Sequence, residues 1–149
     1  MRRWRGLDIF GGTGVRELDG DSARVSVRGV EVGVAGVAID HEGRIPAALA
    51  GLSPEAFSLF LYHYPDQLEA LAPLGVDHLC AGHSHGGQIA LPFYGALVTL
   101  SRMGKRYEWG LYRSGASVMY VNRGIGVDPA IPARIFARPE VTVIEVSGS

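Results

Sequence analysis

The feature that most constrains the fold is a pair of short apolar runs that flank a helical segment. Phe57–Tyr62 and Val76–Ala81 have the length and composition of buried strands. Between them, Asp66 and Glu69 have the spacing of a helix capping box, so we expect a helix over 66–74. This order predicts a βαβ unit, whose two strands are parallel and whose carboxyl ends share one edge of a sheet.

Three histidines follow the two predicted strands. His63 comes directly after the first run, and His83 and His85 follow the second in the glycine-rich segment Gly82–Gln88. The shared edge predicts that all three imidazoles lie on one rim. Neutral imidazole is a good ligand for zinc, manganese or iron. We therefore predict His63, His83 and His85 as metal ligands, with the last two diverging so that each serves a different ion.

The other histidines have weaker sequence support. His78, beside Asp77, is expected to be structural or solvated. The pair Asp40 and His41 at the end of another apolar run is an alternative ligand site.

Composition limits the classes of protein that fit. The 149 residues, 47% hydrophobic and 19% charged, predict a single globular domain over 1–149, with an irregular segment over 1–20. The net charge of −1 gives no electrostatic case for a nucleic-acid partner. One cysteine favours a reducing compartment, hence a cytoplasmic location, and no apolar run is long enough for an integral membrane segment.

The rest of the chain is predicted to be rich in strands. Together with the βαβ unit, these strands predict an α/β fold. We expect a hairpin of Ala23–Arg28 and Val30–Val34 and a short helix within Arg44–Leu52. The further strands expected after the histidines are Trp109–Tyr112, Ser117–Asn122, Ile135–Phe136 and Val141–Val146.

Several motifs together carry a family resemblance. Gly82–Gln88 (GHSHGGQ) resembles the last signature of the calcineurin-like metallophosphoesterases, in the branch that reads G-H-T-H-G-G-Q. Tyr62–Asp66 resembles the S-H-x-P-D motif of that branch, and the segments 120–126 and 138–141 match its C-terminal pattern. The similarity extends over roughly 15–146.

The resemblance implies both a fold and a chemistry. The fold implied is an α/β ββ-sandwich with flanking helices, of which this chain holds a part. The site implied is a pair of zinc, manganese or iron ions, with His63 and His83 on the second metal and His85 on the first. The reaction implied is hydrolysis of a phosphomonoester or phosphodiester by a metal-bound hydroxide. The substrate is then a phosphoester small molecule or a lipid-linked phosphate, and a membrane-peripheral location is the alternative to a freely cytoplasmic one.

The chain departs from the family in its first half. The motifs Asp-x-His, Gly-Asp-x-x-Asp and Gly-Asn-His are absent, so the bridging aspartate and the general acid have no counterpart. We therefore expect the C-terminal half of a phosphoesterase domain, truncated, that binds one metal or none and hydrolyses phosphoesters weakly. The alternatives are a non-catalytic remnant or interaction module that retains the sheet, and a mononuclear zinc-binding protein that uses the same three histidines.

Five aromatic residues and one arginine follow the histidine loop, and the sequence allows two roles for each. The aromatic residues either line an apolar substrate groove or pack within the core and hairpins: Phe93, Tyr94, Tyr107, Trp109 and Tyr112. Arg123 either contacts a phosphate or faces outward.

Overall fold

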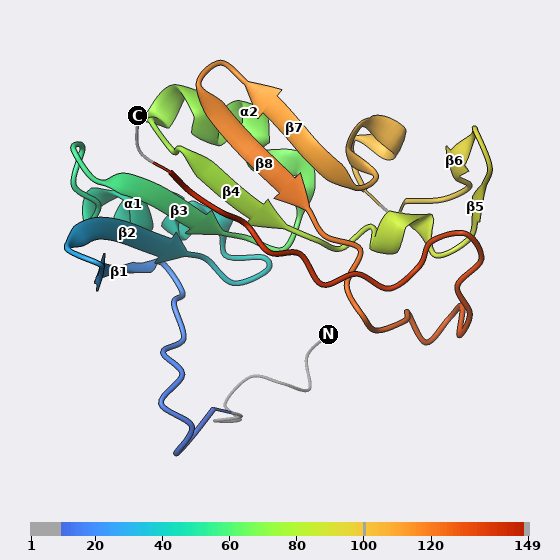
Figure 1. Cartoon of the computed structure of the whole chain (residues 1–149), viewed down its shortest axis with the longest axis horizontal. Coiled ribbons are helices and arrows are strands. Elements are labelled where there is room, and N and C mark those ends of the chain that lie inside the picture. The colour runs from blue at the N-terminus through green and yellow to red at the C-terminus, as the bar shows by residue number, and fades with distance from the viewer. Residues whose placement is uncertain (1–9, 100, 148–149) are drawn as a thin grey trace.

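The computed structural model describes residues 10–99 and 101–147, and its main feature is a mixed six-stranded sheet (Figure 1). β2, β3, β4 and β8 are parallel, whereas β1 and β7 at the two outer positions are antiparallel to their neighbours. The four central strands therefore end at the same edge of the sheet. In spatial order the strands are β1 (Asp21–Val27), β2 (Val30–Gly36), β3 (Phe57–Leu61), β4 (His78–Ala81), β8 (Ser117–Val121) and β7 (Gly110–Ser114).

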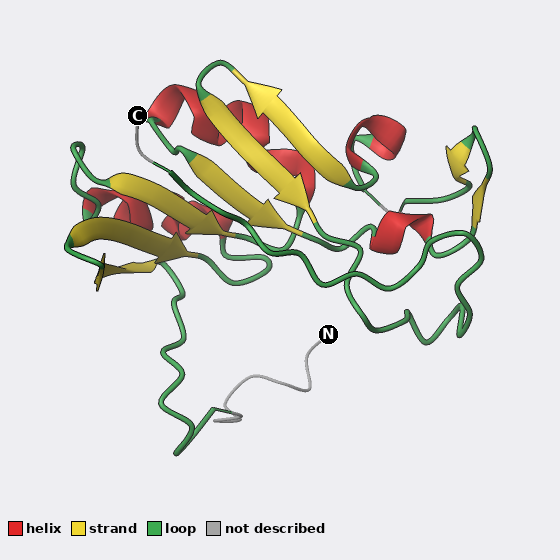
Figure 2. Ribbon diagram, in the orientation of Figure 1, coloured by secondary structure: helices red, strands yellow, loops and turns green. Residues whose placement is uncertain are grey.

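Short helical segments cover one face of this sheet (Figure 2). They are α1 (Ile45–Ala50) and α2 (Leu68–Leu71), with the 3-10 turns η1 (Glu42–Arg44), η2 (Pro65–Gln67) and η3 (Ala72–Leu74). Beyond the sheet edge lie η4 (His85–Gly87), η5 (Gly104–Tyr107) and a ribbon of β5 (Ala90–Leu91) and β6 (Gly95–Ala96). In the part of the chain that the structure describes, no helix has the length and hydropathy to cross a membrane.

The core is a row of apolar side chains on the helix-covered face. Ala35, Phe60, Leu79 and Met119 are neighbours in register on four adjacent strands, and each is at most 1% exposed. The two leucines of α2 belong to the same cluster. Burying a large apolar side chain stabilises the fold by roughly 1.5–3 kcal/mol. This row therefore holds the parallel strands in their register.

The opposite face of the sheet is only partly covered within the described residues. The segment 138–147 runs across it (Figure 1), where Tyr120 donates a hydrogen bond to Glu140 and Asn122 donates one of 2.8 Å to Thr142 Oγ1. Leu61 and Leu111 lie in register with Tyr120 and remain 39% and 56% exposed.

Most of the predicted elements are present. The βαβ unit is confirmed as β3, α2 and β4, with β3 parallel to β4. The first hairpin is confirmed as β1 and β2, and the second as β7 and β8. The helix expected within 44–52 is α1. The α/β fold class is confirmed, since a mixed sheet with few helices is consistent with a partial metallophosphoesterase-type fold. Residues 10–20 contain no helix or strand, and 1–9 lie outside the described residues.

The two strands expected near the C-terminus were wrong. Ile135 and Phe136 form only isolated bridges to Ile89, and Val141–Val146 contains no strand. Val141 and Val143 are 82% and 91% exposed. Alternating valines give a segment the pattern of a strand, but a strand forms only where its backbone groups find a partner. This segment crosses the face of the sheet and does not pair with either edge strand, so it finds no partner (Figure 1).

The predicted capping box was also wrong. Asp66 lies inside η2 and makes no cap, because its carboxylate instead accepts hydrogen bonds from Ser101 and from the backbone of Arg102. Glu69 accepts bonds from Arg106, Tyr107 and Ser114. Tertiary contacts therefore take both carboxylates away from the helix start.

A reciprocal pair of hydrogen bonds links the N-terminal ends of β3 and β4. The Ser58 hydroxyl donates to Asp77 Oδ2 at 2.8 Å and accepts from the Asp77 N–H at 2.8 Å. The Ser58 N–H donates to the same carboxylate oxygen at 2.7 Å. Ser58 is 4% exposed, so losing these bonds would leave buried polar groups without partners.

Gly87 is the point where the β5–β6 ribbon meets the histidine loop. Its φ is +78°, and a Cβ at this position would lie 2.8 Å from Ala96 Cα and 2.9 Å from the Val98 carbonyl oxygen. Both neighbours are backbone atoms, so neither can move as a flexible side chain would. Gly115 in the β7–β8 turn has a φ of +57° but open space around it.

We predict that Asp77→Ala lowers the free energy of unfolding by about 1–3 kcal/mol, because it leaves the buried N–H of Ser58 without its acceptor and the Ser58 hydroxyl with only the Gly75 carbonyl at 3.3 Å. Asp77→Asn is the matched control, since its amide oxygen can still accept from Ser58. Urea unfolding measures the difference. Equal stability of the alanine and asparagine variants would contradict this role for the carboxylate.

We predict that Gly87→Ala is more destabilising than Gly115→Ala by about 1–3 kcal/mol. Both substitutions place a Cβ in the left-handed region, but only the first also drives it into backbone atoms. Denaturant unfolding followed by tryptophan fluorescence separates the two variants. An equal loss in both would show that the ribbon is not packed on Gly87.

Candidate functional site

The candidate site lies where the central parallel strands end. The hydrogen bonding of the sheet continues past the strand ends: the Gly82 N–H donates to the His63 carbonyl at 3.0 Å, and the Asn122 N–H donates to the Ala81 carbonyl at 2.9 Å. The backbone after β3 is thus held beside the backbone after β4. This contact brings His63 and the histidine loop together across 20 residues of sequence.

His63 and His83 form the centre of the site. His63 Nε2 lies 3.2 Å from His83 Nδ1, and the two ring planes are inclined by 72°. The ring of Tyr64 packs edge-on against His83, with 4.4 Å between centroids. Burial is the largest cause that lowers the pKa of His63, and the charges of His83 and His85 lower it further. The environment therefore favours a neutral imidazole at His63, the form that can bind a metal.

The loop that carries His83 and His85 is tightly wound. His83, His85 and Gln88 have φ of 70°, 51° and 52°. Residues other than glycine adopt a positive φ only when their surroundings impose it. Two motif side chains supply these surroundings. The Ser84 hydroxyl donates to the Glu108 carbonyl, and Gln88 donates from Nε2 to the Ile131 carbonyl at 2.6 Å. These anchoring roles were not predicted from the sequence.

His85 lies against an arginine that the sequence reading missed. Arg134 Nη2 is 3.1 Å from His85 Nδ1, and Arg134 Nη1 donates to the His85 carbonyl at 3.2 Å. Burial is the largest cause that lowers the pKa of His85, followed by the charge of Arg134, while a hydrogen bond to the backbone of Gly126 acts in the opposite direction. A lone arginine 49 residues downstream carries no sequence signal that would have linked it to this histidine.

The donor set fits part of a metal centre. Two nitrogens bound to one tetrahedral zinc ion at 2.0–2.1 Å lie about 3.4 Å apart, close to the observed separation of His63 and His83. Within 10–99 and 101–147, however, no group of three or more histidine, cysteine or acidic side chains could hold a metal ion. His85 therefore does not complete a set with the other two. The pair fits one ion with two imidazoles, and the described residues add no carboxylate to it.

The remaining histidines lie elsewhere in the fold. His41 Nδ1 pairs with Asp19 at 2.8 Å, not with its neighbour Asp40, and Arg44 pairs with the same carboxylate at 2.6 Å. His78 is not solvated: it is 7% exposed, its Nε2 has no hydrogen-bond partner among the described residues, and burial lowers its pKa.

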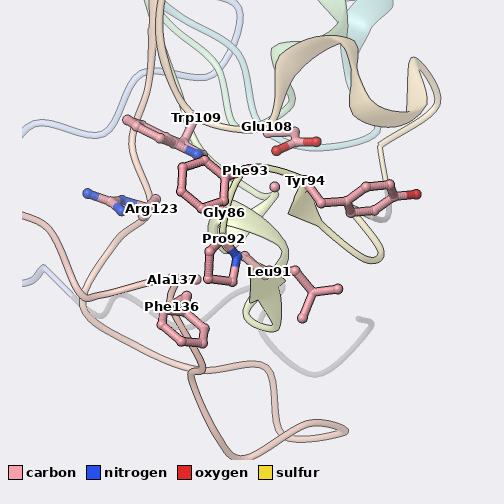
Figure 3. Close-up of a pocket in the computed structure, with 12 residues that line it drawn as sticks. Gly86, Leu91, Pro92, Phe93, Tyr94, Glu108, Trp109, Arg123, Phe136 and Ala137 are labelled. Carbon is pink, nitrogen blue, oxygen red and sulfur yellow. The ribbon is translucent and has the colours of Figure 1, made fainter.

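An open aromatic groove adjoins the histidine loop at Gly86 (Figure 3). Its volume is about 600 Å³, and its walls include Phe93, Trp109 and Phe136. Of the five aromatic residues considered, Phe93, Tyr94 and Trp109 line this groove. Tyr107 belongs to the core at 3% exposed, and Tyr112 packs edge-on against it.

Arg123 forms one side of the groove and is already paired. Its Nε donates to Glu140 at 2.6 Å, and its guanidinium lies 4.6 Å from the centre of the Trp109 ring. It therefore neither faces outward nor stands unpaired. Instead, it connects the C-terminal segment, through Glu140, to the aromatic wall at Trp109; Figure 3 shows Arg123 beside Trp109.

No family model matches the chain, and no solved structure matches it significantly. Known proteins do resemble it in sequence. It is 41% identical over 110 residues to the uncharacterized metallophosphoesterase YkuE of Bacillus subtilis, a match covering 74% of this chain and 36% of that protein. It is 36% identical over 88 residues to the phosphodiesterase YaeI of Escherichia coli, covering 59% and 32%.

A third relative has a more specific name. The chain is 31% identical over 104 residues to the UDP-2,3-diacylglucosamine pyrophosphatase LpxG of Chlamydia muridarum, covering 65% of this chain and 31% of that protein. The chain thus spans about a third of the length of each of these relatives. Their names, together with the histidine edge, support the metallophosphoesterase family for this chain.

Proposed function

We propose that this chain, as one domain, carries the histidine part of a metal-dependent phosphoesterase site. The observation that supports the proposal is the 3.2 Å approach of His63 Nε2 to His83 Nδ1 at the edge where the parallel strands end. These two residues would hold one divalent ion, and His85 would face a second. Zinc, manganese or iron at this position supplies Lewis-acid chemistry, which polarises a phosphoryl oxygen and activates water.

The residues of this chain have distinct roles in that proposal. His63 and His83 bind, while Tyr64 packs against the His83 ring and orients it. Ser84 and Gln88 hold the loop in its wound conformation. Arg134 donates to His85 Nδ1 and so fixes the direction of the ring, in contrast to the acceptor that the second nitrogen of a metal-ligating histidine commonly faces.

The substrate class proposed is a phosphomonoester or phosphodiester, either a small molecule or a lipid-linked phosphate. The name of LpxG describes a pyrophosphatase that acts on a diacylated sugar nucleotide. Here the aromatic groove starts at Gly86, next to His85, so an apolar part of a substrate would lie along Phe93 and Phe136. A cytoplasmic location, or a membrane-peripheral one for a lipid-linked substrate, fits this proposal.

The charge of the donor set limits what the chain does alone. Neutral imidazoles offset none of the charge of a dication, and no described carboxylate joins His63 and His83. We therefore propose that this chain alone binds one ion weakly and hydrolyses slowly. The alternative functions are a non-catalytic module and a mononuclear zinc-binding protein. Metal binding and phosphoester hydrolysis distinguish them from the proposed phosphoesterase.

We predict that His63→Ala and His83→Ala each weaken zinc binding by about tenfold or more, because each removes one of two ligands. His41→Ala is the control, since His41 pairs with Asp19 in another part of the fold. Calorimetric titration of the purified chain with zinc measures the affinities. Zinc binding that is unchanged in both of the first two variants would contradict the assignment.

We predict that the purified chain hydrolyses bis-p-nitrophenyl phosphate slowly and binds at most one equivalent of metal. Metal content by mass spectrometry and the release of p-nitrophenol are the measurements. Rapid turnover with two equivalents of bound metal would contradict the predicted slow hydrolysis and low metal content. Stoichiometric zinc with no hydrolysis at all would favour the mononuclear zinc-binding protein, and neither metal nor hydrolysis would favour the non-catalytic module.

A further inference from the structure

A second, smaller hollow lies at His83, one of the two paired histidines. Its volume is about 210 Å³, and it is lined by Tyr64, Asp66, His83 and Arg102. Its lining residues are all polar or aromatic, in contrast to the apolar wall of the larger groove. Arg102 reaches this hollow from a segment 36 residues beyond Asp66.

The carboxylate of Asp66 fixes the turn that carries Arg102. Asp66 Oδ1 accepts a hydrogen bond from the Ser101 hydroxyl at 2.6 Å, and Oδ2 accepts one from the Arg102 N–H at 3.2 Å. Ser101 Oγ accepts in turn from the Met103 N–H at 3.1 Å. Both carboxylate oxygens are thus directed at the turn, which explains why Asp66 makes no helix cap.

The charged group of Arg102 differs from those of its cationic neighbours, Lys105 and Arg106, in its lack of an ion pair among the described residues. Arg106 pairs with Glu69 at 2.6 Å, and Lys105 lies 3.3 Å from Glu108. Among the described residues, the Arg102 guanidinium makes no ion pair and no hydrogen bond. Its positive charge nevertheless acts on Glu42. The pKa of Glu42 is lowered mainly by the hydrogen bond from Tyr62 and further by the charge of Arg102. Arg102 is exposed, so its five N–H donors can reach a ligand in the hollow.

We propose that Arg102 is a phosphate-binding residue of this site and that Asp66 is its positioning residue. The inference rests on the proposed phosphoesterase function, because it assigns Arg102 to the phosphate group of a substrate held at the His63–His83 edge. A planar guanidinium binds two phosphate oxygens at once, which gives both affinity and orientation. The wall made by Arg102 and His83 then selects an anion, while Asp66 acts through the turn and not on the ligand.

The test is the binding of inorganic phosphate to the purified chain without metal, measured by calorimetry. Arg102→Gln should weaken binding by about tenfold, and Arg102→Lys should recover part of the loss because it restores the charge but not the planar fork. Arg106→Gln is the matched control, four residues away and already paired with Glu69, and should bind as the unmodified chain does.

The positioning role has a separate readout. Asp66→Ala should weaken phosphate binding with Arg102 still present, and the double variant should bind no more weakly than Arg102→Gln alone, since the two residues act as a unit. Asp66→Asn keeps one acceptor oxygen and serves if the alanine variant is unfolded by circular dichroism. Additive losses in the double variant would overturn the positioning role.

Phosphate binding that is absent in the unmodified chain, or equal in the chain and in Arg102→Gln, would overturn the assignment of Arg102. These measurements use neither metal nor hydrolysis. If zinc binding and hydrolysis fail while phosphate binding still depends on Arg102, the phosphoesterase proposal falls and the anion site stands. If zinc binding depends on His63 but phosphate binding does not depend on Arg102, the reverse holds.

Discussion

The parallel register of β3, β4 and β8 is the constraint on which the site depends. The apolar row from Ala35 to Met119 places these strands side by side, and a slip of one residue would send that row to the other face. Because the register holds, the backbone bonds after the strands bring His63 beside Gly82. The 3.2 Å contact of the two imidazoles is therefore a consequence of core packing as well as of the loop.

Contacts from distant parts of the chain then give the loop and its surroundings their shape. Arg134 donates hydrogen bonds to the carbonyl groups of His85, Arg123 and Ala137, so one guanidinium joins the histidine loop to the segment after β8. Gln88 binds the same segment through Ile131. The loop conformation, with its positive φ at His83 and His85, is thus imposed from outside the loop as well as by its glycines.

The parts predicted from the sequence are those that depend on local pattern. The hairpins and the βαβ unit follow from apolar runs and turn residues, and the meeting of His63 with His83 follows from the parallel strands. Long-range polar contacts were not predictable: Asp66 has a capping-box spacing but binds Ser101, 35 residues away. Val141–Val146 has a strand pattern, but pattern alone does not reveal whether a partner strand exists. That the histidines ligate a metal stays a prediction.

The charges around the histidine edge favour an anion over a cation. Burial is the largest cause that lowers the pKa of Arg134, followed by the charge of Arg123, and no described carboxylate forms an ion pair with Arg134. Of the nearby acids, Glu140 pairs with Arg123 and Asp66 binds the turn of Ser101, while Asp128 acts on His85 through its charge. A dication at His63 and His83 would lie near Arg102, which lines the same hollow as His83 and makes no ion pair among the described residues, and this positive charge would weaken its binding. A phosphate group at the same edge would offset that charge, so in this part of the site anion binding and metal binding support each other.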